Sequence, residues 1–327
     1  MQGKRPIIFY TNGFETYLWD DANSAPRLVS GIFPQKDINA MIERRCIKKS
    51  VNSIQIDKQI TDRWYQLRAV TKCCENYEKG IRKCLLVMAT GTGKTRTAAS
   101  IVDVMTRSEL MGKVLFLADR KELVKQAKDA FYKYIENTTM CNLLLNKDER
   151  NAKIIFSTYQ TMLHAIDTIK NADGSRFFSP GHFSLIVIDE AHRSIFNKYK
   201  AIFQYFDACL LGLTATPKNT IHQSTYTFFD MKNNIPTDVY EYEEAVEEIV
   251  LEEKVETAVI SHPSIEKTKI EILINLMKID GKIDDAEVKF IEDFINKTNL
   301  ASEDKFELIS RLGSGEKIKS PLFCFKK

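Results

Sequence analysis

The residues best suited to chemistry lie in a short turn, Ala-Thr-Gly-Thr-Gly-Lys-Thr, at positions 89–95. The turn follows an apolar run and precedes a helix-like stretch, which is the setting that a phosphate-binding P-loop requires. Gly91 and Gly93 allow the backbone to curl so that successive N–H groups face phosphate oxygens. The N-terminus of the following helix favours the same anion. Lys94 adds a positive charge for the β- and γ-phosphates, and Thr95 adds a hydroxyl for Mg²⁺.

This turn therefore predicts a site for ATP and Mg²⁺. The full P-loop pattern has Gly or Ala where Met88 stands. That departure concerns strand packing at the entrance of the loop and leaves the Gly, Lys and Thr positions intact. The alternative is a plain glycine-rich turn between a strand and a helix. The predicted ATP-binding residues of the loop are Thr90, Gly91, Thr92, Gly93, Lys94 and Thr95.

Two carboxylates follow another apolar run, at residues 185–188. Ligands of parallel sheets bind at the carboxyl ends of the strands, so Asp189 is predicted to hold Mg²⁺, through water. Glu190 is predicted to orient or deprotonate the attacking water. His192 is predicted to link the nucleotide site to neighbouring elements. Taken alone, the pattern also fits a solvated helix start with acidic residues in favourable positions.

Two further candidates carry weaker signals. Gln66 lies upstream of the loop, and a glutamine amide can pair with both N6 and N7 of adenine. A surface glutamine on a helix is the alternative. Thr214 and Thr216 follow another buried run, where a threonine-rich strand end is the alternative.

The elements that must position these residues follow a regular alternation. Short apolar runs alternate with stretches at helical spacing, which extend to about residue 107 and over about residues 121–135. Such alternation predicts a parallel sheet with helices on both faces, in a doubly wound α/β domain. The expected strands are residues 84–88, 114–117, 154–156, 185–188 and 210–213.

The flanks differ from this core. Residues 7–11 and 17–19 predict a hairpin around Asn12-Gly13, and because a lone hairpin is marginal in water, it should belong to a larger sheet. Residues 36–79 look helical. After residue 236 an acidic, helix-prone stretch leads into a small all-α unit. Its three predicted helices are marked by Ile272, Leu273, Leu276 and Met277; by Phe290, Ile291, Phe294 and Ile295; and by Phe306, Leu308, Ile309 and Leu312.

The composition is that of a globular protein of two domains. The chain has 327 residues, 44% of them hydrophobic and 28% charged, which excludes a mostly disordered or collagen-like chain. No apolar run approaches the roughly 20 residues of a membrane span. The net charge of +3 does not by itself indicate that the protein binds nucleic acid. The seven cysteines form no C-x-x-C pair, and reduced thiols in a cytoplasmic protein are expected.

The order of the motifs resembles that of superfamily 2 helicases and translocases. Several segments also resemble the motor (R) subunit of type I restriction enzymes, over about residues 1–247. The resemblance implies a RecA-like P-loop domain that binds ATP, Mg²⁺ and double-stranded DNA, in a complex with methylation and specificity subunits. The segments that carry it are residues 9–13, 17–20, 88–95, 117–120, 157–160 and 213–218.

The same resemblance implies residues that contact DNA and residues that transmit its binding. Arg120 and Lys121 match a position facing the DNA backbone, although a surface pair at a helix start is the alternative. Thr158 and Gln160 match another strand-contacting position. Their task would be salt-sensitive phosphate binding without sequence preference. Thr214 and Thr216 would couple nucleotide to DNA.

Two parts of that family's enzymes are not found in this sequence. No Asp with a Glu-x-Lys pair precedes the P-loop in a strand setting, so no DNA cleavage by this chain alone is expected. No second set of parallel strands follows residue 247, and the only arginine beyond Arg193 is Arg311. An arginine finger from a second domain contributes orders of magnitude to turnover, so we expect this chain to hydrolyse ATP slowly.

The C-terminal helices resemble the TerB-like domain of tellurite resistance proteins. An EF-hand is not expected, because Leu276 and Lys278 occupy ligand positions. Asp280, Asp284 and Glu287 are weak metal candidates, with helix capping and solubility as the alternative. The predicted division is a nuclease-end remnant and linker at 1–50, a RecA-like motor domain at 51–236, an acidic linker at 237–263, the helical domain at 264–312 and a tail at 313–327.

The sequence thus favours a DNA-dependent motor domain of a type I restriction enzyme. One alternative is a nucleotide-binding regulatory module without turnover, which recruits a partner through its helical end. Another is the non-functional remnant of a broken gene. Sequence alone does not separate a natural fusion from such a remnant.

Overall fold

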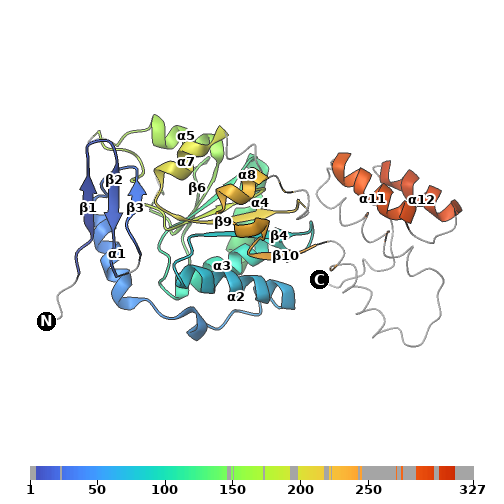
Figure 1. Cartoon of the computed structure of the whole chain (residues 1–327), viewed down its shortest axis with the longest axis horizontal. Coiled ribbons are helices and arrows are strands. Elements are labelled where there is room, and N and C mark those ends of the chain that lie inside the picture. Colours follow the sequence, from blue (N-terminus) through green and yellow to red (C-terminus); the bar gives the residue numbers. More distant parts are fainter. Residues whose placement is uncertain are drawn as a thin grey trace. The chain divides into compact units, whose positions relative to one another are not determined.

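The computed structural model describes residues 5–22, 24–145, 149, 151–171, 174–191, 198–216, 221, 223–241, 244, 270, 274, 285–297 and 302–313. The chain is grouped by its contacts into two compact units (Figure 1). The larger unit comprises Met1–Met88 and Gly93–Val239, and the smaller comprises Ala89–Thr92 and Tyr240–Lys327.

A seven-stranded sheet in the order β10-β4-β9-β8-β5-β7-β6 forms the centre of the larger unit. The pairs β4–β9, β9–β8, β8–β5, β5–β7 and β7–β6 are all parallel. The predicted fold class, an α/β RecA-like P-loop domain, is therefore confirmed. The strands are β4 (Lys83–Met88), β5 (Val114–Ala118), β6 (Met140–Asn142), β7 (Ile154–Thr158), β8 (Leu185–Ile188), β9 (Cys209–Thr214) and β10 (Asp238–Tyr240).

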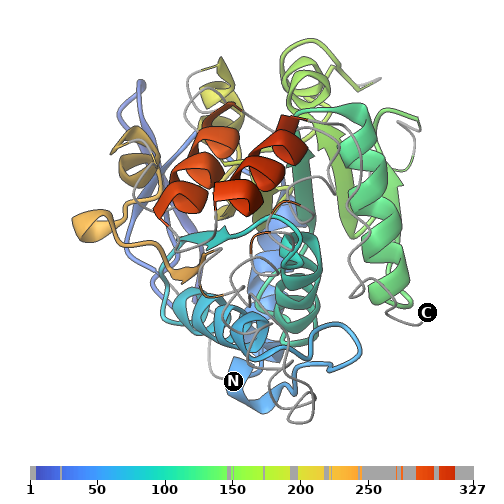
Figure 2. The same cartoon turned by 90° about the vertical axis from the view of Figure 1, so that its right-hand side faces the viewer.

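Helices cover both faces of this sheet (Figures 1 and 2). On one face α2, α3 and α4 pack in succession, and on the other α5 pairs with α7. Because side chains alternate along a strand, Phe116 of β5 packs edge-to-face against Phe131 of α4, while its neighbours Leu115 and Leu117 join the core under α5. The helices are α2 (Trp64–Glu78), α3 (Lys94–Arg107), α4 (Lys121–Tyr134), α5 (Tyr159–Asp167), α7 (Lys200–Tyr205) and α8 (Gln223–Phe228), with a 3-10 turn η3 (Lys232–Asn234).

A separate antiparallel sheet precedes this core. The predicted hairpin is confirmed as β1 (Ile8–Thr11) and β2 (Thr16–Trp19), with Gly13 at a φ of 93° in the connecting turn. A third strand, β3 (Arg27–Val29), pairs with β2. The hairpin was expected to belong to a larger sheet, and this strand supplies part of it. Leu18, Val29 and Phe33 form the buried core beneath.

The prediction of helix over residues 36–79 is wrong in its middle. The structure has α1 (Gln35–Ile47), a 3-10 turn η1 (Val51–Ser53) and then α2, which begins only at Trp64. The intervening segment is held by turns, in which the Asp57 carbonyl accepts from the N–H groups of Ile60 and Thr61. Asn, Ser and Asp favour such turns over helix interiors because their side chains compete for backbone hydrogen bonds.

An ion-pair cluster joins the antiparallel sheet to the parallel one. The Asp207 side chain is only 7% exposed and accepts hydrogen bonds from Arg27 of β3 at 2.8 and 2.7 Å and from Arg82 at 2.7 Å. Nearby, a Cβ at Gly181 would lie 2.4 Å from a ring carbon of Phe33, so the backbone and the ring are in close contact. These contacts fix β3 and its loop against the segments before β4, β8 and β9.

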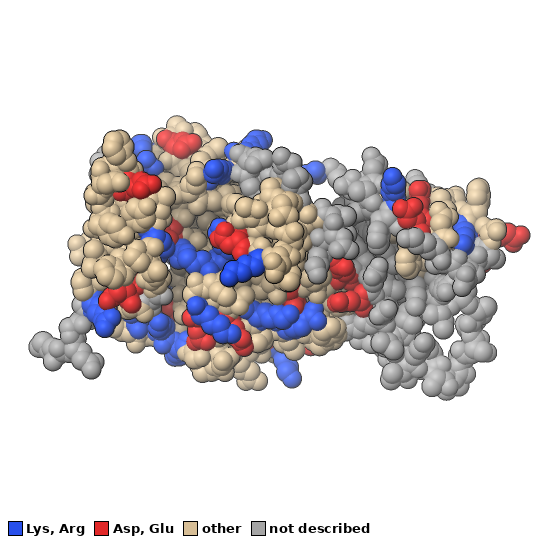
Figure 3. Space-filling model, in the orientation of Figure 1, with Lys and Arg blue, Asp and Glu red and all other residues tan. Residues whose placement is uncertain are grey.

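A second ion-pair cluster anchors the edge strand β10. The buried carboxylate of Asp238 accepts from Lys72 Nζ at 2.6 Å and Arg68 Nε at 3.1 Å, both on α2. Arg68 also donates to the Val239 carbonyl at 2.6 Å. Lys and Arg side chains gather over the part of the surface where α2 lies (Figure 3). Part of that positive charge is therefore engaged in holding β10.

In the smaller unit, two predicted helices are confirmed as α11 (Asp285–Lys297) and α12 (Ser302–Gly313). The first predicted helix lies largely outside the described residues, as do Asp280, Asp284 and most of the acidic stretch. Phe306, one of the residues that marked the third predicted helix, is 78% exposed. It stands two residues before the buried Leu308, which is about 200° around a helix. The buried hydrophobic cluster of this unit contains Ile270, Ile274, Ile291, Ile295 and Leu308.

Two general features complete the fold. Every cysteine among the described residues is a free thiol. Within the same residues, no helix combines the length and the apolar character needed to cross a membrane. The domain boundaries and the TerB-like character expected from the sequence remain predictions.

Candidate nucleotide site

The strand register brings most of the predicted site residues to one edge of the sheet. Val87 lies beside Thr214, Leu117 beside Ile188, and Ala118 beside Thr158. Since these strands are parallel, the segments that follow them start at the same, carboxyl edge. Those segments contain the P-loop, Arg120, Gln160, Asp189 and Thr216.

The P-loop backbone has the conformation that its glycines were predicted to permit. Gly91 has a φ of 82° and Gly93 a φ of 90°, in the left-handed region that other residues seldom adopt. The Thr92 hydroxyl donates to the Ala89 carbonyl at 2.6 Å. Gly93 is the N-cap of α3, and its carbonyl accepts from the Thr97 N–H at 2.9 Å. Such a loop at the start of a helix presents N–H groups suited to an anion.

Lys94 and Thr95 occupy the first turn of α3, and both are half-buried. None of the ion pairs formed by the described residues involves Lys94. An ammonium in this position is available to a phosphate. The predicted contacts of both residues with ATP and Mg²⁺ remain predictions.

Gln66 lies against the P-loop. Its side chain is on α2, the residue is 2% exposed, and a Cβ at Gly93 would lie 2.5 Å from its Nε2 atom. The surface glutamine that the sequence left open as an alternative is therefore excluded. A side chain at Gly93 would displace the Gln66 amide and would be strained by the φ of 90°. Adenine recognition by Gln66 remains a prediction.

The acidic pair follows β8 in a defined turn. The Asp189 N–H donates to the Leu117 carbonyl at 2.9 Å, and the Ala191 N–H donates to the Leu213 carbonyl at 2.8 Å. Between them Glu190 has a φ of 52°. A non-glycine residue in this region is uncommon and is a feature of functional sites. Both carboxylate residues are half-buried, whereas His192 lies outside the described residues.

Tyr159 contacts this turn, although the sequence analysis gave it no role. Its hydroxyl donates to the Asp189 carbonyl at 3.1 Å, and its ring stacks on Tyr199 at 5.1 Å between centroids. Burial raises the pKa of Tyr159 well above its usual value, and the charges of Asp189, Asp119 and Glu190 add to this effect. The sequence showed that Tyr159 belongs to the 157–160 motif, but it did not show that the side chain contacts the turn after β8.

The residues expected to contact DNA differ in exposure. Arg120, Lys121 and Gln160 are exposed. Thr158 is 6% exposed, and its hydroxyl accepts from the Thr161 N–H at 3.3 Å as the N-cap of α5. This gives Thr158 a structural role. Its predicted contact with DNA has no independent support.

Thr214 and Thr216 lie where β9 ends. Thr214 is buried, and its hydroxyl accepts from the Thr216 N–H at 3.1 Å. The bond tightens the turn that leaves β9, beside the turn of Asp189. Their coupling of nucleotide to DNA remains a prediction.

The donor set at this edge fits Mg²⁺ bound together with a nucleotide. Within the described ranges, no group of three or more His, Cys, Asp or Glu residues could hold a metal alone. Mg²⁺ at phosphate sites uses one or two protein oxygens with phosphates and waters. Asp189 and Thr95 supply oxygens of that kind.

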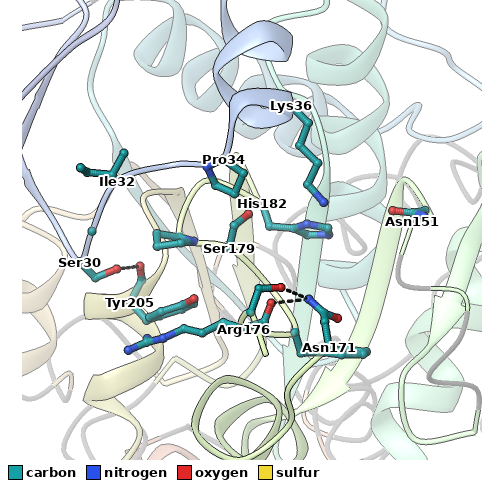
Figure 4. A pocket seen from close by; sticks show the side chains of 14 residues that line it. Ser30, Ile32, Pro34, Lys36, Asn151, Asn171, Arg176, Ser179, His182 and Tyr205 are labelled. Carbon is teal, nitrogen blue, oxygen red and sulfur yellow. Dashed lines mark hydrogen bonds between the residues drawn. The ribbon is translucent and has the colours of Figure 1, made fainter. Parts of the chain in front are cut away.

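A cavity of about 740 Å³ lies at the opposite, amino edge of the sheet (Figure 4). Lys36 extends into it from the first turn of α1, near His182, which precedes β8. The Ser30 hydroxyl donates to the Tyr205 carbonyl at 2.7 Å on its border. None of the predicted site residues lines this cavity. Nucleotides bind parallel sheets at the carboxyl edge, so the P-loop edge is the candidate site.

Buried tyrosines predict a loss of stability at alkaline pH. Burial raises the pKa of Tyr77 and of Tyr159 well above 10.0, the value expected in the unfolded chain. Above that pH the unfolded chain releases protons that the folded chain retains. The stabilisation is complete below this pH, and the free energy of unfolding falls above it by about 1.4 kcal/mol per pH unit for each tyrosine. We expect urea denaturation at several pH values above 10 to show that the free energy of unfolding falls less steeply with pH in Tyr77→Phe than in the unmodified chain. An equal fall in both chains would contradict the role of Tyr77.

Together the fold and the P-loop edge define a RecA-like P-loop domain. Residues 59–219 match the family "Type III restriction enzyme, res subunit". The chain is 32% identical over 265 residues to the type I restriction enzyme EcoAI endonuclease subunit of Escherichia coli, covering 74% of this chain and 31% of that subunit. It is also 32% identical over 181 residues to the EcoKI endonuclease subunit of Escherichia coli (strain K12), covering 47% of this chain and 15% of that one.

A solved helicase domain, that of Pyrococcus furiosus Hef, aligns with a TM-score of 0.41 and 24% identity, covering 78% of this chain and 58% of that one. By sequence, residues 59–219 are similar to the ResIII family, and the chain is homologous to the endonuclease subunits of type I restriction enzymes. It spans less than a third of the length of these curated relatives.

Proposed function

We propose that the chain is an ATP- and DNA-binding motor domain of a type I restriction endonuclease subunit. The observation that carries the proposal is the carboxyl edge of the sheet, where β4 leads into the P-loop and β8 into Asp189 and Glu190. Homology to restriction subunits supports the same assignment. Double-stranded DNA and the methylation and specificity subunits are the proposed partners.

The residues of this edge divide the work of phosphoryl transfer. The N–H groups of residues 90–95 and the ammonium of Lys94 bind the phosphates, while Gln66 contacts the adenine. Thr95 and Asp189 hold Mg²⁺, which neutralises charge on the phosphate oxygens when it is bound. Glu190 orients the attacking water and accepts its proton.

DNA contacts follow from the exposed residues at the same edge. Arg120, Lys121 and Gln160 would bind phosphates without reading the base sequence. We also propose that the helical region at 264–312 is a TerB-like module that recruits a partner.

The test combines nucleotide binding, phosphate release and DNA binding by the purified chain. We expect ATP to bind with Mg²⁺ and double-stranded DNA to raise a low rate of phosphate release. The double variant Arg120→Ala/Lys121→Ala should weaken DNA binding similarly for all sequences and reduce the slope of log K against log salt by about 1 to 2. ATP affinity should be unchanged in that variant.

Two outcomes would contradict the proposal. ATP binding without phosphate release under any DNA condition would favour the regulatory module. If the slope of log K against log salt were unchanged in the double variant, Arg120 and Lys121 would not be part of the DNA-binding surface. Lys125→Ala, a change at another exposed cation of α4, is the control for a non-specific effect of charge.

A further inference from the structure

Tyr159 connects two segments of the site that belong to different strands. Tyr159 is the first residue of α5, directly after β7. Its hydroxyl donates a hydrogen bond to the carbonyl of Asp189, directly after β8. The side chain is 1% exposed. The hydrogen bond therefore lies inside the protein, where an unsatisfied carbonyl would be costly.

The accepting carbonyl determines how Glu190 is held. The C=O of Asp189 belongs to the same planar peptide group as the N–H of Glu190. Fixing that oxygen restrains the ψ of Asp189 and the φ of Glu190. This is the φ of 52° that the structure shows for Glu190, a conformation that carries a steric cost and needs support from its surroundings.

The other end of the contact lies in the segment expected to face DNA. Tyr159 stands between Thr158, which caps α5, and the exposed Gln160. The phenol ring stacks on the buried Tyr199 with an interplanar angle of 18°, which limits its movement independently of the hydroxyl. A shift of the start of α5 would move the phenol and, through it, the Asp189–Glu190 peptide.

We propose that Tyr159 is a positioning residue that holds the Asp189–Glu190 peptide in its left-handed turn and ties it to the DNA-facing start of α5. This deepens the proposed function and rests on it. The phenol makes turnover depend on the position of α5, while the P-loop binds ATP without its help.

Tyr159→Phe in the full chain tests this role, because it removes the hydroxyl and keeps the stacked ring. We expect DNA-stimulated kcat to fall about tenfold with KM and ATP affinity within about twofold. Amide hydrogen exchange at residues 189–191 should rise. Tyr77→Phe is the matched control, since its hydroxyl donates to the Leu210 carbonyl at 2.8 Å, a buried bond away from the site. It should change neither kcat nor exchange at residues 189–191.

Equal losses of kcat in both variants, or unchanged exchange at residues 189–191 in Tyr159→Phe, would overturn the proposal. A parallel rise in KM would assign Tyr159 to nucleotide binding and would also overturn it. If the unmodified chain releases no phosphate at all, the proposed function fails, and the exchange measurement alone then decides whether the phenol holds the turn.

Discussion

Replacing Lys94 by alanine is expected to weaken ATP·Mg²⁺ binding by about 10- to 100-fold and to reduce phosphate release by about 100-fold or more. In the proposed site, the Lys94 ammonium supplies a positive charge to the terminal phosphates. It acts on charge that grows during transfer, so turnover suffers more than binding. Equilibrium binding of a fluorescent ATP analogue and a phosphate-release assay with DNA measure the two effects separately.

Glu190→Gln is the companion variant, because it keeps the size of the side chain and removes its basicity. It should bind ATP as the unmodified chain does and lose phosphate release. Lys125→Ala, on the exposed surface of α4, should leave both quantities unchanged. If Lys94→Ala bound and hydrolysed ATP normally, the P-loop assignment would be wrong.

The largest effect on stability is expected from Asp207→Ala, at about 3–5 kcal/mol of unfolding free energy. The carboxylate lies between Arg27 and Arg82, whose side chains are 19% and 35% exposed. Burial opposes its ionisation, but the hydrogen bond from Arg27 and the charges of Arg82 and Arg27 outweigh burial and lower the pKa of Asp207 below 3.8. Its removal would leave two partly buried guanidinium groups without their partner.

The pH dependence of this pair has a definite sign. Because the folded pKa of Asp207 is lowered, its stabilisation is complete above the unfolded value of 3.8 and is lost as the pH falls through the folded value. Urea denaturation should therefore show that the difference in unfolding free energy between the unmodified chain and Asp207→Ala becomes smaller as the pH falls. Asp103→Ala, which breaks the pair between Asp103 and Arg107 on α3, should cost less than about 1 kcal/mol. Equal costs at both sites would contradict the role of Asp207.

The strands that carry the site were predictable because each is an uninterrupted apolar run and helix-like stretches separate most of these runs. Residues 185–188 match β8 at both ends, and the ends predicted for α3 and α4 agree within one residue. The glycines of the P-loop were recognisable because only glycine readily takes the backbone conformation found at positions 91 and 93. The α/β fold and the location of the site thus follow from local patterns.

The features that escaped prediction depend on contacts distant in the sequence. The edge strands β3, β6 and β10 have three residues each, too few to show a period. The contacts of Tyr159 with the Asp189 carbonyl and of Gln66 with Gly93 depend on tertiary packing. The sequence does not show which distant group a side chain will contact.

The anchoring of β10 has a mechanical consequence. This strand lies next to β4, and the Asp238 carboxylate ties it to Arg68 and Lys72 of α2. Tension arriving along the chain from beyond residue 240 therefore loads these ion pairs and the hydrogen bond from the Thr237 N–H to the Leu85 carbonyl. The load is passed to α2, which carries Gln66, and to β4, which leads into the phosphate loop. A pull on the downstream chain would therefore act first on the two elements that border the proposed nucleotide site.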